Sequence, residues 1–174
     1  MFPSTIHTAR LLLRPICRAD AEPIFLRYTR DPEVSRYLTW QPHTSVAQTG
    51  AYIESCLAAT TSRTYAMVMP QAQEIVGAFD LRRAAQFKAE YGYVLARSEW
   101  GKGLMTEALT AVVAWALAQP DIWRIGGVCD VDNIGSARVM EKSGLAREGI
   151  LRRWIMHPNI SAEPRDCLSY AKTR

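Results

Sequence analysis

The chain has 174 residues, of which 48% are hydrophobic and 22% are charged. A chain of this length and balance is expected to form a single globular domain over residues 1–174. Neither a membrane-spanning apolar run nor a signal-peptide pattern is present, so we expect a cytoplasmic protein with no membrane partner. The net charge of +4 suits a polyanionic ligand and would equally suit weak nucleic-acid binding.

The cysteines are widely spaced and form no C-x-x-C motif. Cysteines without such spacing, and without a nearby pair of histidines, are expected to be buried thiols rather than disulfides, metal ligands or nucleophiles. We therefore expect no metal site. The residues are Cys17, Cys56, Cys129 and Cys167.

Apolar periodicity predicts short strands and helices along the first half of the chain. Asp31 is placed as the N-cap of a short helix, with Pro32 as its first helical residue. Ser45 is placed to cap a longer helix. In the loop between these helices we expect Trp40 to pack and His43 to be solvated, with contact between these residues and a substrate as the alternative. The predicted elements are strands at residues 10–14, 65–69, 74–81 and 90–95, and helices near residues 24–28, 31–38 and 45–57.

The second half of the chain predicts a βαβ crossover that packs a helix on a sheet. Asn133 is a plausible N-cap for a second helix, and Gly144 is placed to end it in the left-handed conformation. The predicted elements are a strand at 90–95, a helix with apolar positions from 105 to 116, a strand at 123–129, a helix at 133–143, and strands at 149–154 and 165–171.

The turn before the first of these helices contains Gly101, Lys102 and Gly103. A glycine-rich turn that opens a helix leaves backbone N–H groups unpaired at the positive end of the helix dipole, which makes an anion site and most often a phosphate site. A P-loop would need glycine at Ala96, and a dinucleotide fingerprint would need it at Thr106, so neither motif is complete. A turn whose glycines serve only tight geometry is the alternative.

Asn133 and Ser136 lie on one face of their helix, at the same end of the sheet as the glycine-rich turn, so their polar groups converge on one cleft. Together with the segments 91–95, 100–109 and 141–145, this pattern resembles the GNAT superfamily of acetyltransferases. The resemblance is closest to the RimJ/RimL-like branch, which acetylates the amino-terminal residue of ribosomal proteins, and it covers nearly the whole chain.

The resemblance implies an α/β (α+β) fold with a mixed, mostly antiparallel sheet of about six to seven strands and helices on both faces. It also implies acetyl-CoA as co-substrate. The glycine-rich turn would bind the pyrophosphate by backbone amides, the preceding strand would pair with the pantetheine arm, and the second helix would reach the pantetheine and its sulfur. The implied cofactor-binding residues are Tyr93, Val94, Leu95, Trp100, Gly101, Lys102, Gly103, Leu104, Met105, Thr106, Asn133 and Ser136.

Two positions depart from the family pattern. The six-residue phosphate motif begins with Gln or Arg and ends with Gly or Ala, whereas this chain has Trp100 and Met105; backbone donors survive that change, although Met105 would crowd the phosphate if it faced it. Many members also have, at the position of Met140, a tyrosine that protonates the departing thiolate, and methionine has no proton to donate. That position is therefore unable to protonate the thiolate, and we assign a catalytic, thiolate-stabilising role to Ser136, the nearest hydroxyl, with helix packing as the alternative.

The implied reaction is direct attack of a neutral amine on the acetyl thioester. An α-amine with a pKa of ~7.7–8 is partly neutral at physiological pH, whereas a lysine near ~10.4 costs roughly 4 kcal/mol to deprotonate. An α-amine therefore needs only a mild base, acting directly or through water. Glu90 is the candidate catalytic base, with an exposed strand carboxylate as the alternative, and N–H groups near Val94 and Leu95 would polarise the thioester carbonyl.

We therefore predict an acetyl-CoA-dependent N-acetyltransferase whose partner is an amine-bearing substrate, with a protein amino terminus of the ribosomal-protein type favoured. The alternatives are a small-molecule amine (a polyamine, amino acid or antibiotic) and a non-catalytic acyl-CoA sensor. A nucleic-acid binder is supported by charge alone, because no groove-reading motif is present. Both a monomer and a homodimer fit the sequence.

Overall fold

The computed structural model describes residues 2–174, and its strands form one eight-stranded sheet. The strands are β1 (Ile6–His7), β2 (Leu12–Pro15), β3 (Ser62–Met69), β4 (Glu74–Ala85), β5 (Lys88–Leu95), β6 (Arg124–Asp130), β7 (Ala146–Ile155) and β8 (Arg165–Thr173). They lie in the order β1-β2-β3-β4-β5-β6-β8-β7, and every neighbouring pair is antiparallel except β5 and β6. The predicted mixed, mostly antiparallel sheet is confirmed, with one more strand than expected.

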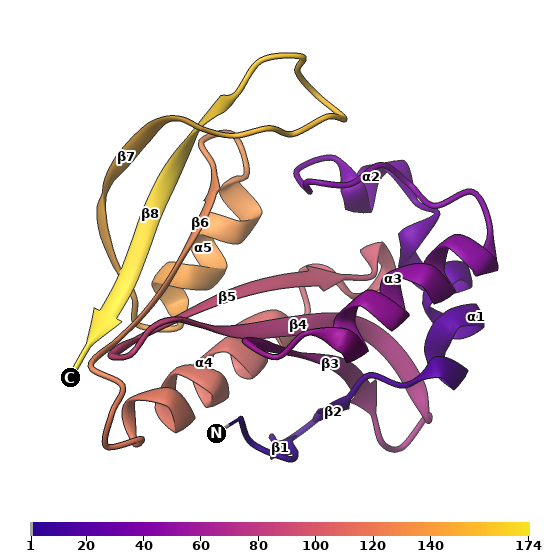
Figure 1. Ribbon diagram of the computed structural model, residues 1–174, viewed down its shortest axis with the longest axis horizontal. Coiled ribbons are helices and arrows are strands. Elements are labelled where there is room, and N and C mark those ends of the chain that lie inside the picture. The colour runs from indigo at the N-terminus through magenta and orange to yellow at the C-terminus, as the bar shows by residue number, and fades with distance from the viewer. Residues whose placement is uncertain (1) are drawn as a thin grey trace.

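Helices cover both faces of this sheet, as predicted. The helical elements are η1 (Arg18–Asp20), α1 (Ala21–Ile24), the π-helix η2 (Phe25–Thr29), α2 (Pro32–Ser35), α3 (Val46–Ala58), η3 (Arg97–Glu99), α4 (Leu104–Leu117) and α5 (Ile134–Lys142). One core cluster contains residues of α4 and α5, and the other contains residues of α1, α2 and α3. In Figure 1, α1–α3 lie at one end of the molecule and the yellow end of the chain, β7 and β8, at the other.

The helix caps predicted from the sequence are confirmed, although the helix expected through residue 38 ends at Ser35. Asp31, Ser45 and Asn133 each accept a hydrogen bond from a backbone N–H two or three residues later, at 2.9, 3.2 and 3.1 Å. Gly144 has a φ of 80° directly after α5, and the N–H of Leu145 returns to a carbonyl of the last helical turn at 3.2 Å. Local side-chain chemistry therefore sets these boundaries, as the capping rules require.

The amino-terminal strand differs from the prediction. A strand was expected at residues 10–14, but the N–H of Thr8 donates to the carbonyl of Leu11 at 2.9 Å, which makes a turn there. The chain consequently forms a short hairpin in which β1 pairs with β2, with Ile6 opposite Leu13. The two-residue strand β1 is too short to show any period in the sequence, which is why it was missed.

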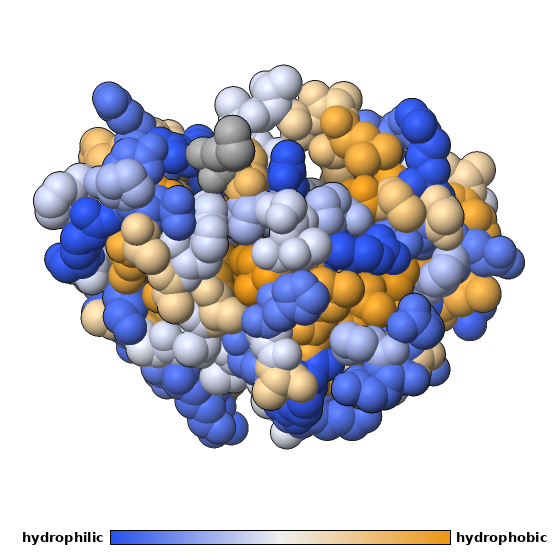
Figure 2. All heavy atoms as spheres, turned by 90° about the horizontal axis from the view of Figure 1, so that it is seen from below, coloured by the Kyte–Doolittle hydropathy of each residue, from blue (hydrophilic) through white to orange (hydrophobic). Residues whose placement is uncertain are grey.

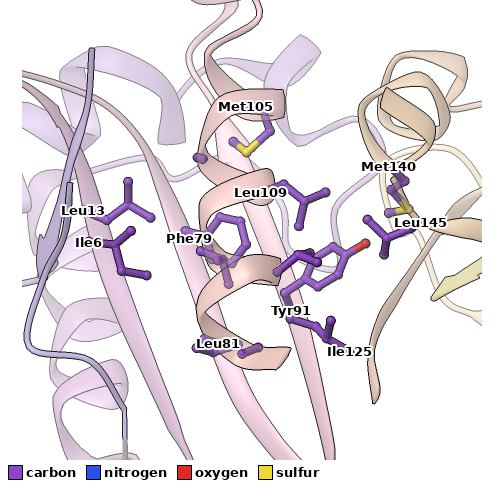
Figure 3. Packing of buried hydrophobic residues seen from close by; sticks show 14 of the residues in the cluster. Ile6, Leu13, Phe79, Leu81, Tyr91, Met105, Leu109, Ile125, Met140 and Leu145 are labelled. Carbon is purple, nitrogen blue, oxygen red and sulfur yellow. The ribbon is translucent and has the colours of Figure 1, made fainter. Parts of the chain in front are cut away.

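The larger core lies between the sheet and α4. Phe79 of β4 and Leu109 of α4 have no exposed surface, and Tyr91 of β5 is 5% exposed; Figure 3 shows these side chains packed together. Seen from below Figure 1, hydrophilic side chains surround apolar atoms near the middle of the face (Figure 2). None of the helices within residues 2–174 has the length and apolarity needed to cross a bilayer.

Gly77 allows β4 and β5 to approach closely. A Cβ atom at this position would lie 2.3 Å from the carbonyl oxygen of Val94 and 3.2 Å from the Cα of Leu95. Both are backbone atoms, which cannot rotate away as a flexible side chain would. The small residue therefore sets the position of the carboxyl end of β5.

We expect Gly77→Ala to lower the free energy of unfolding by about 1–3 kcal/mol, the usual cost of forcing an extra group into a packed site. The matched control is Gly50→Ala in α3, where an added Cβ has nothing within 4 Å; a helical Gly→Ala change there should be neutral or stabilising by up to about 1 kcal/mol. Urea unfolding measures both. Equal effects of the two substitutions would contradict this account of β5.

Candidate active site

The parallel strands β5 and β6 separate part of the way along the sheet. They pair only at Lys88–Arg124, Ala89–Ile125 and Glu90–Gly126. Beyond these pairs β5 stays paired with β4 to its end, and β6 stays paired with β8. Residues 91–95 of β5 and 127–130 of β6 thus face each other unpaired, and we call this region the β5–β6 fork.

The backbone of β5 directs some of its amides into the fork. The N–H of Ala96 donates to a carbonyl of β4 at 2.8 Å, and residues of an antiparallel strand alternate between their two neighbours. The amides of Tyr93 and Leu95 therefore point into the fork, whereas that of Val94 points toward β4. Trp100 donates its indole N–H to the carbonyl of Leu95 at 2.8 Å, which leaves the Leu95 N–H as the free group.

The glycine-rich turn presents a row of free donors. The backbone N–H groups of residues 101–106 have no acceptor within residues 2–174. Gly101 and Gly103 have φ values of 76° and 77°, in the left-handed region that favours glycine. Leu104 and Met105 are buried in the core, so they offer the turn only their amides and Met105 does not crowd it. These residues fit a bound diphosphate.

Lys102 uses its charge within the turn. Its Nζ atom lies 3.0 Å from Oε2 of Glu99, a carboxylate that is 6% exposed and also accepts from Ser98 and Arg27. Burial alone would raise the pKa of Glu99, but the hydrogen bonds from Lys102 and Ser98 outweigh burial and lower it. The ammonium group is therefore engaged, and the amides are the free donors.

Glu107 ties the amino-terminal segment to the same turn. Its Oε1 accepts from the Thr8 hydroxyl at 2.6 Å and from the Arg10 N–H at 2.8 Å, and its Oε2 accepts from the Arg10 guanidinium at 2.7 Å. Arg10 also donates to the carbonyl of Lys102 at 3.0 Å. Burial would raise the pKa of Glu107, but these hydrogen bonds lower it. We call this group of contacts the Glu107 clamp.

Because folding lowers the pKa of Glu107, its stabilisation is complete above the unfolded value of ~4.3 and is lost as the pH falls through the folded value. We expect Glu107→Gln to lower the free energy of unfolding at pH 7. The difference from wild type should begin to shrink as the pH falls below the unfolded value, and it should vanish only below the lowered pKa of folded Glu107, where both side chains are uncharged. Urea unfolding between pH 3 and 7 measures this, and a difference that does not change with pH would rule out an ionised clamp.

The structure brings Ser136 and Tyr93 together across the fork, with 2.8 Å between their hydroxyl oxygens. Burial raises the pKa of Tyr93 well above its usual value, although the Ser136 hydrogen bond partly opposes this, so the phenol is protonated at neutral pH. The Oδ1 atom of Asn133 is occupied by its helix cap, which leaves its NH₂ group free. Met140 is buried, and burial raises the pKa of the nearby Cys129 thiol to about 11.

A pocket of about 360 Å³ lies on the opposite face of β5, between the sheet and α3. Its lining includes the aromatic residues Trp40 and Tyr52, and also Gly92 and Val94 of β5. Tyr93 contributes to this lining and to the fork contact, so the two spaces meet at one strand. Among the described residues that line this α3 pocket, the carboxylate is Asp80, a residue that sequence reasoning missed although it is the one acid among apolar residues 75–81.

Glu90 lies on the same face of β5 as Gly92 and Val94, since alternate residues share a face. It forms an ion pair with Lys88 at 2.7 Å and does not line the α3 pocket; its role as base stays a prediction. The expectation for His43 was wrong. Its ring is 8% exposed and Nδ1 lies 2.8 Å from the Thr49 hydroxyl, because α3 covers it.

The cysteines are all unpaired, and they differ in environment. Cys129 and Cys167 are buried, Cys56 is half-buried and Cys17 is exposed, so the expectation of buried thiols holds for only part of the set. Within residues 2–174, no group of three or more His, Cys, Asp or Glu is arranged to hold a metal ion.

A forked sheet with an amide-lined turn at its open end is the arrangement of a protein that binds an anionic ligand. The chain belongs to the GNAT acetyltransferase family, since that family's domain, described as Acetyltransferase (GNAT) domain, matches residues 10–146. The uncharacterized N-acetyltransferase YoaA of Bacillus subtilis (strain 168) is 31% identical over 100% of this chain and 99% of its own length. The protein is therefore an N-acetyltransferase, as predicted.

Solved structures agree with this fold. A GNAT-family acetyltransferase from Bacillus anthracis is 26% identical, has a TM-score of 0.86, and matches 97% of this chain and 98% of its own. RimL, a ribosomal L7/L12 alpha-N-protein acetyltransferase in complex with coenzyme A, has a TM-score of 0.85 at 21% identity, with 97% of each chain covered. Spermidine N-acetyltransferase from Vibrio cholerae, in complex with CoA and spermine, has a TM-score of 0.78 at 17% identity over 95% and 96% of the chains.

Proposed function

We propose that this protein transfers the acetyl group of acetyl-CoA to the α-amine of a protein amino terminus. The observation that carries the proposal is the position of β5 between two spaces. Its Tyr93 and Leu95 amides open on the fork, and Gly92 and Val94 line the α3 pocket on its other side. An acyl donor along the fork and an amine in the pocket would therefore meet at one strand.

Acetyl-CoA, when bound, supplies an activated acetyl thioester. The free amides of residues 101–106 would hold its diphosphate, as helix N-termini bind phosphates. The fork-facing edge at Tyr93 and Leu95 would bind the pantetheine arm as an added strand edge, and the NH₂ group of Asn133 would reach the same arm. Trp100 would form one side of the fork, because its indole N–H already donates to the carbonyl of Leu95.

Ser136 and Tyr93 would stabilise the negative charge on the departing sulfur. The Ser136 hydroxyl would donate a hydrogen bond to the sulfur, and the protonated phenol of Tyr93, 2.8 Å away, would donate one to the Ser136 oxygen. The thiolate would take its proton from solvent, which also receives the proton released by the amine. This pair takes the place of the tyrosine that many family members have at the position of Met140. The Leu95 N–H would polarise the acetyl carbonyl.

The favoured acceptor follows from the difference in pKa between an α-amine and a lysine side chain. Glu90, the proposed base, shares a face of β5 with Gly92 and Val94, which line the α3 pocket, and it would remove a proton through water. An α-amine at ~7.7–8 allows that step at neutral pH, and a lysine side chain near ~10.4 does not. RimL, which shares this fold, is an alpha-N-protein acetyltransferase. A cytoplasmic location and a monomeric or dimeric state stay predictions.

The acceptor class is tested by incubating the protein with acetyl-CoA and cell extract, followed by mass spectrometry of peptides and metabolites separately. We expect new acetyl groups on α-amines of protein amino termini. The control is Gly103→Pro, a variant with a blocked turn. Acetylated metabolites in the absence of acetylated amino termini would replace this acceptor by a small-molecule amine.

We expect Gly101→Val and Gly103→Pro to weaken CoA binding by about tenfold or more, because a branched side chain or a proline cannot keep the left-handed backbone that aims the amides. Lys102→Ala should change the affinity less than about threefold, since its ammonium is paired with Glu99. Isothermal titration calorimetry measures all three. If Lys102→Ala is the most damaging, side-chain charge binds the diphosphate and the amide account is wrong.

Ser136→Ala is expected to lower kcat by about tenfold or more, with the affinity for CoA little changed, because charge develops on sulfur only along the reaction path. Tyr93→Phe keeps the ring and removes the phenol, so it should give a smaller loss of kcat. Steady-state kinetics together with calorimetry separates the two effects. A Ser136→Ala variant that loses CoA affinity while keeping kcat would place the hydroxyl in ground-state binding.

A further inference from the structure

The α3 pocket contains one carboxylate and one guanidinium, both from β4. Asp80 and Arg82 are two positions apart, so they project from the same face of the strand, and Nε of Arg82 lies 3.2 Å from Oδ2 of Asp80. The hydroxyl of Thr64 donates to Oδ1 of Asp80 at 3.0 Å. The side chain of Asp80 is 28% exposed and that of Arg82 is 46% exposed, so both have room for a further partner.

The strand opposite places a glycine beside Asp80. Asp80 is paired with Gly92 of β5, and directly opposed residues of antiparallel strands have Cα atoms about 5 Å apart. Gly92 has no side chain, and the guanidinium of Arg82 lies over it, since a Cβ there would be 3.0 Å from Nη2 of Arg82. A group bound at Asp80 would therefore contact Arg82 over Gly92, beside Tyr93 in the same pocket.

The charges around this space are balanced. Apart from Asp80 and Arg82, the described residues that line the α3 pocket are apolar, aromatic or hydroxyl- and thiol-bearing. One carboxylate can accept hydrogen bonds from one amine, and Trp40 and Tyr52 offer aromatic faces that favour a cation. A second positive charge would meet Arg82, and Glu90, which lies opposite Arg82 on β5, is already paired with Lys88. Selectivity that depends on repulsion as well as attraction is a common way to exclude wrong partners.

We propose that Asp80 and Arg82 form the charge filter of the acceptor site. Asp80 binds the amine of an acceptor that carries one positive charge there, and Arg82 excludes acceptors with a second positive charge close by, such as polyamines. The inference rests on the proposed function, because it requires that the α3 pocket receives the acceptor.

The test uses two probes, a pentapeptide with a free amino-terminal serine and spermidine. Each is titrated by calorimetry into CoA-saturated protein, and acetylation rates are measured in parallel. We expect Asp80→Asn to weaken peptide binding by about tenfold or more, the usual effect of losing a charge-assisted hydrogen bond. Arg82→Gln should strengthen spermidine binding by about tenfold and change peptide binding less than threefold, since it removes the repulsion.

The chain provides a matched control pair outside the pocket. Arg83 and Asp121 form an ion pair at 2.8 Å, so Arg83→Gln and Asp121→Asn make the same charge changes without touching the α3 pocket. Both should bind the two probes as wild type does. If Asp80→Asn fails to fold, Arg82→Gln still decides the question, because its side chain is well exposed.

The outcomes separate the two levels of the proposal. If wild-type protein binds CoA and acetylates the peptide, but Asp80→Asn binds the peptide normally or Arg82→Gln leaves spermidine binding unchanged, the charge filter is overturned and the proposed function stands. If wild-type protein does not bind CoA, the proposed function itself fails. A wild-type preference for spermidine over the peptide would also overturn the filter.

Discussion

The separation of β5 from β6 after Glu90 and Gly126 is the constraint on which the rest of the site depends. A buried strand edge with unpaired N–H and C=O groups is costly unless something satisfies them. Here the indole of Trp100 takes the Leu95 carbonyl, and the hydroxyls of Tyr93 and Ser136 bridge the opening. The remaining amides are available to a ligand, and in the proposed function this opening in the sheet would hold the co-substrate.

The glycine-rich turn is proposed as an anion site although two carboxylates lie next to it. Glu99 and Glu107 would repel a diphosphate if their charges were free, but each is enclosed by donors from neighbouring segments. Their charge is used to fix the turn, and the free amides point elsewhere. The side chains therefore fix the turn, and the backbone amides stay free for a ligand. For this reason the ion pair of Lys102 with Glu99 leaves the proposed anion site intact.

Local features of the site were accessible from the sequence, and long-range ones were not. The caps at Asp31 and Asn133 and the left-handed end at Gly144 depend on a few adjacent residues, so pattern alone located them. The Tyr93–Ser136 contact joins residues 43 apart, and the Thr8–Glu107 contact joins residues 99 apart. No periodicity reports such pairings, because they follow from the order of strands in the sheet. The α3 pocket was missed for the same reason, since it is assembled from β3, β4, β5 and α3.

The Glu107 clamp also has a consequence for the order in which the protein is made. Thr8 and Arg10 are among the first residues to leave the ribosome, but their partner is synthesised about a hundred residues later. The amino-terminal hairpin must therefore wait, without its anchor, until α4 has emerged. During synthesis, the glycine-rich turn is therefore fixed late, only after α4 can contact Thr8 and Arg10. Residues made first thus complete a site formed mainly by residues made later.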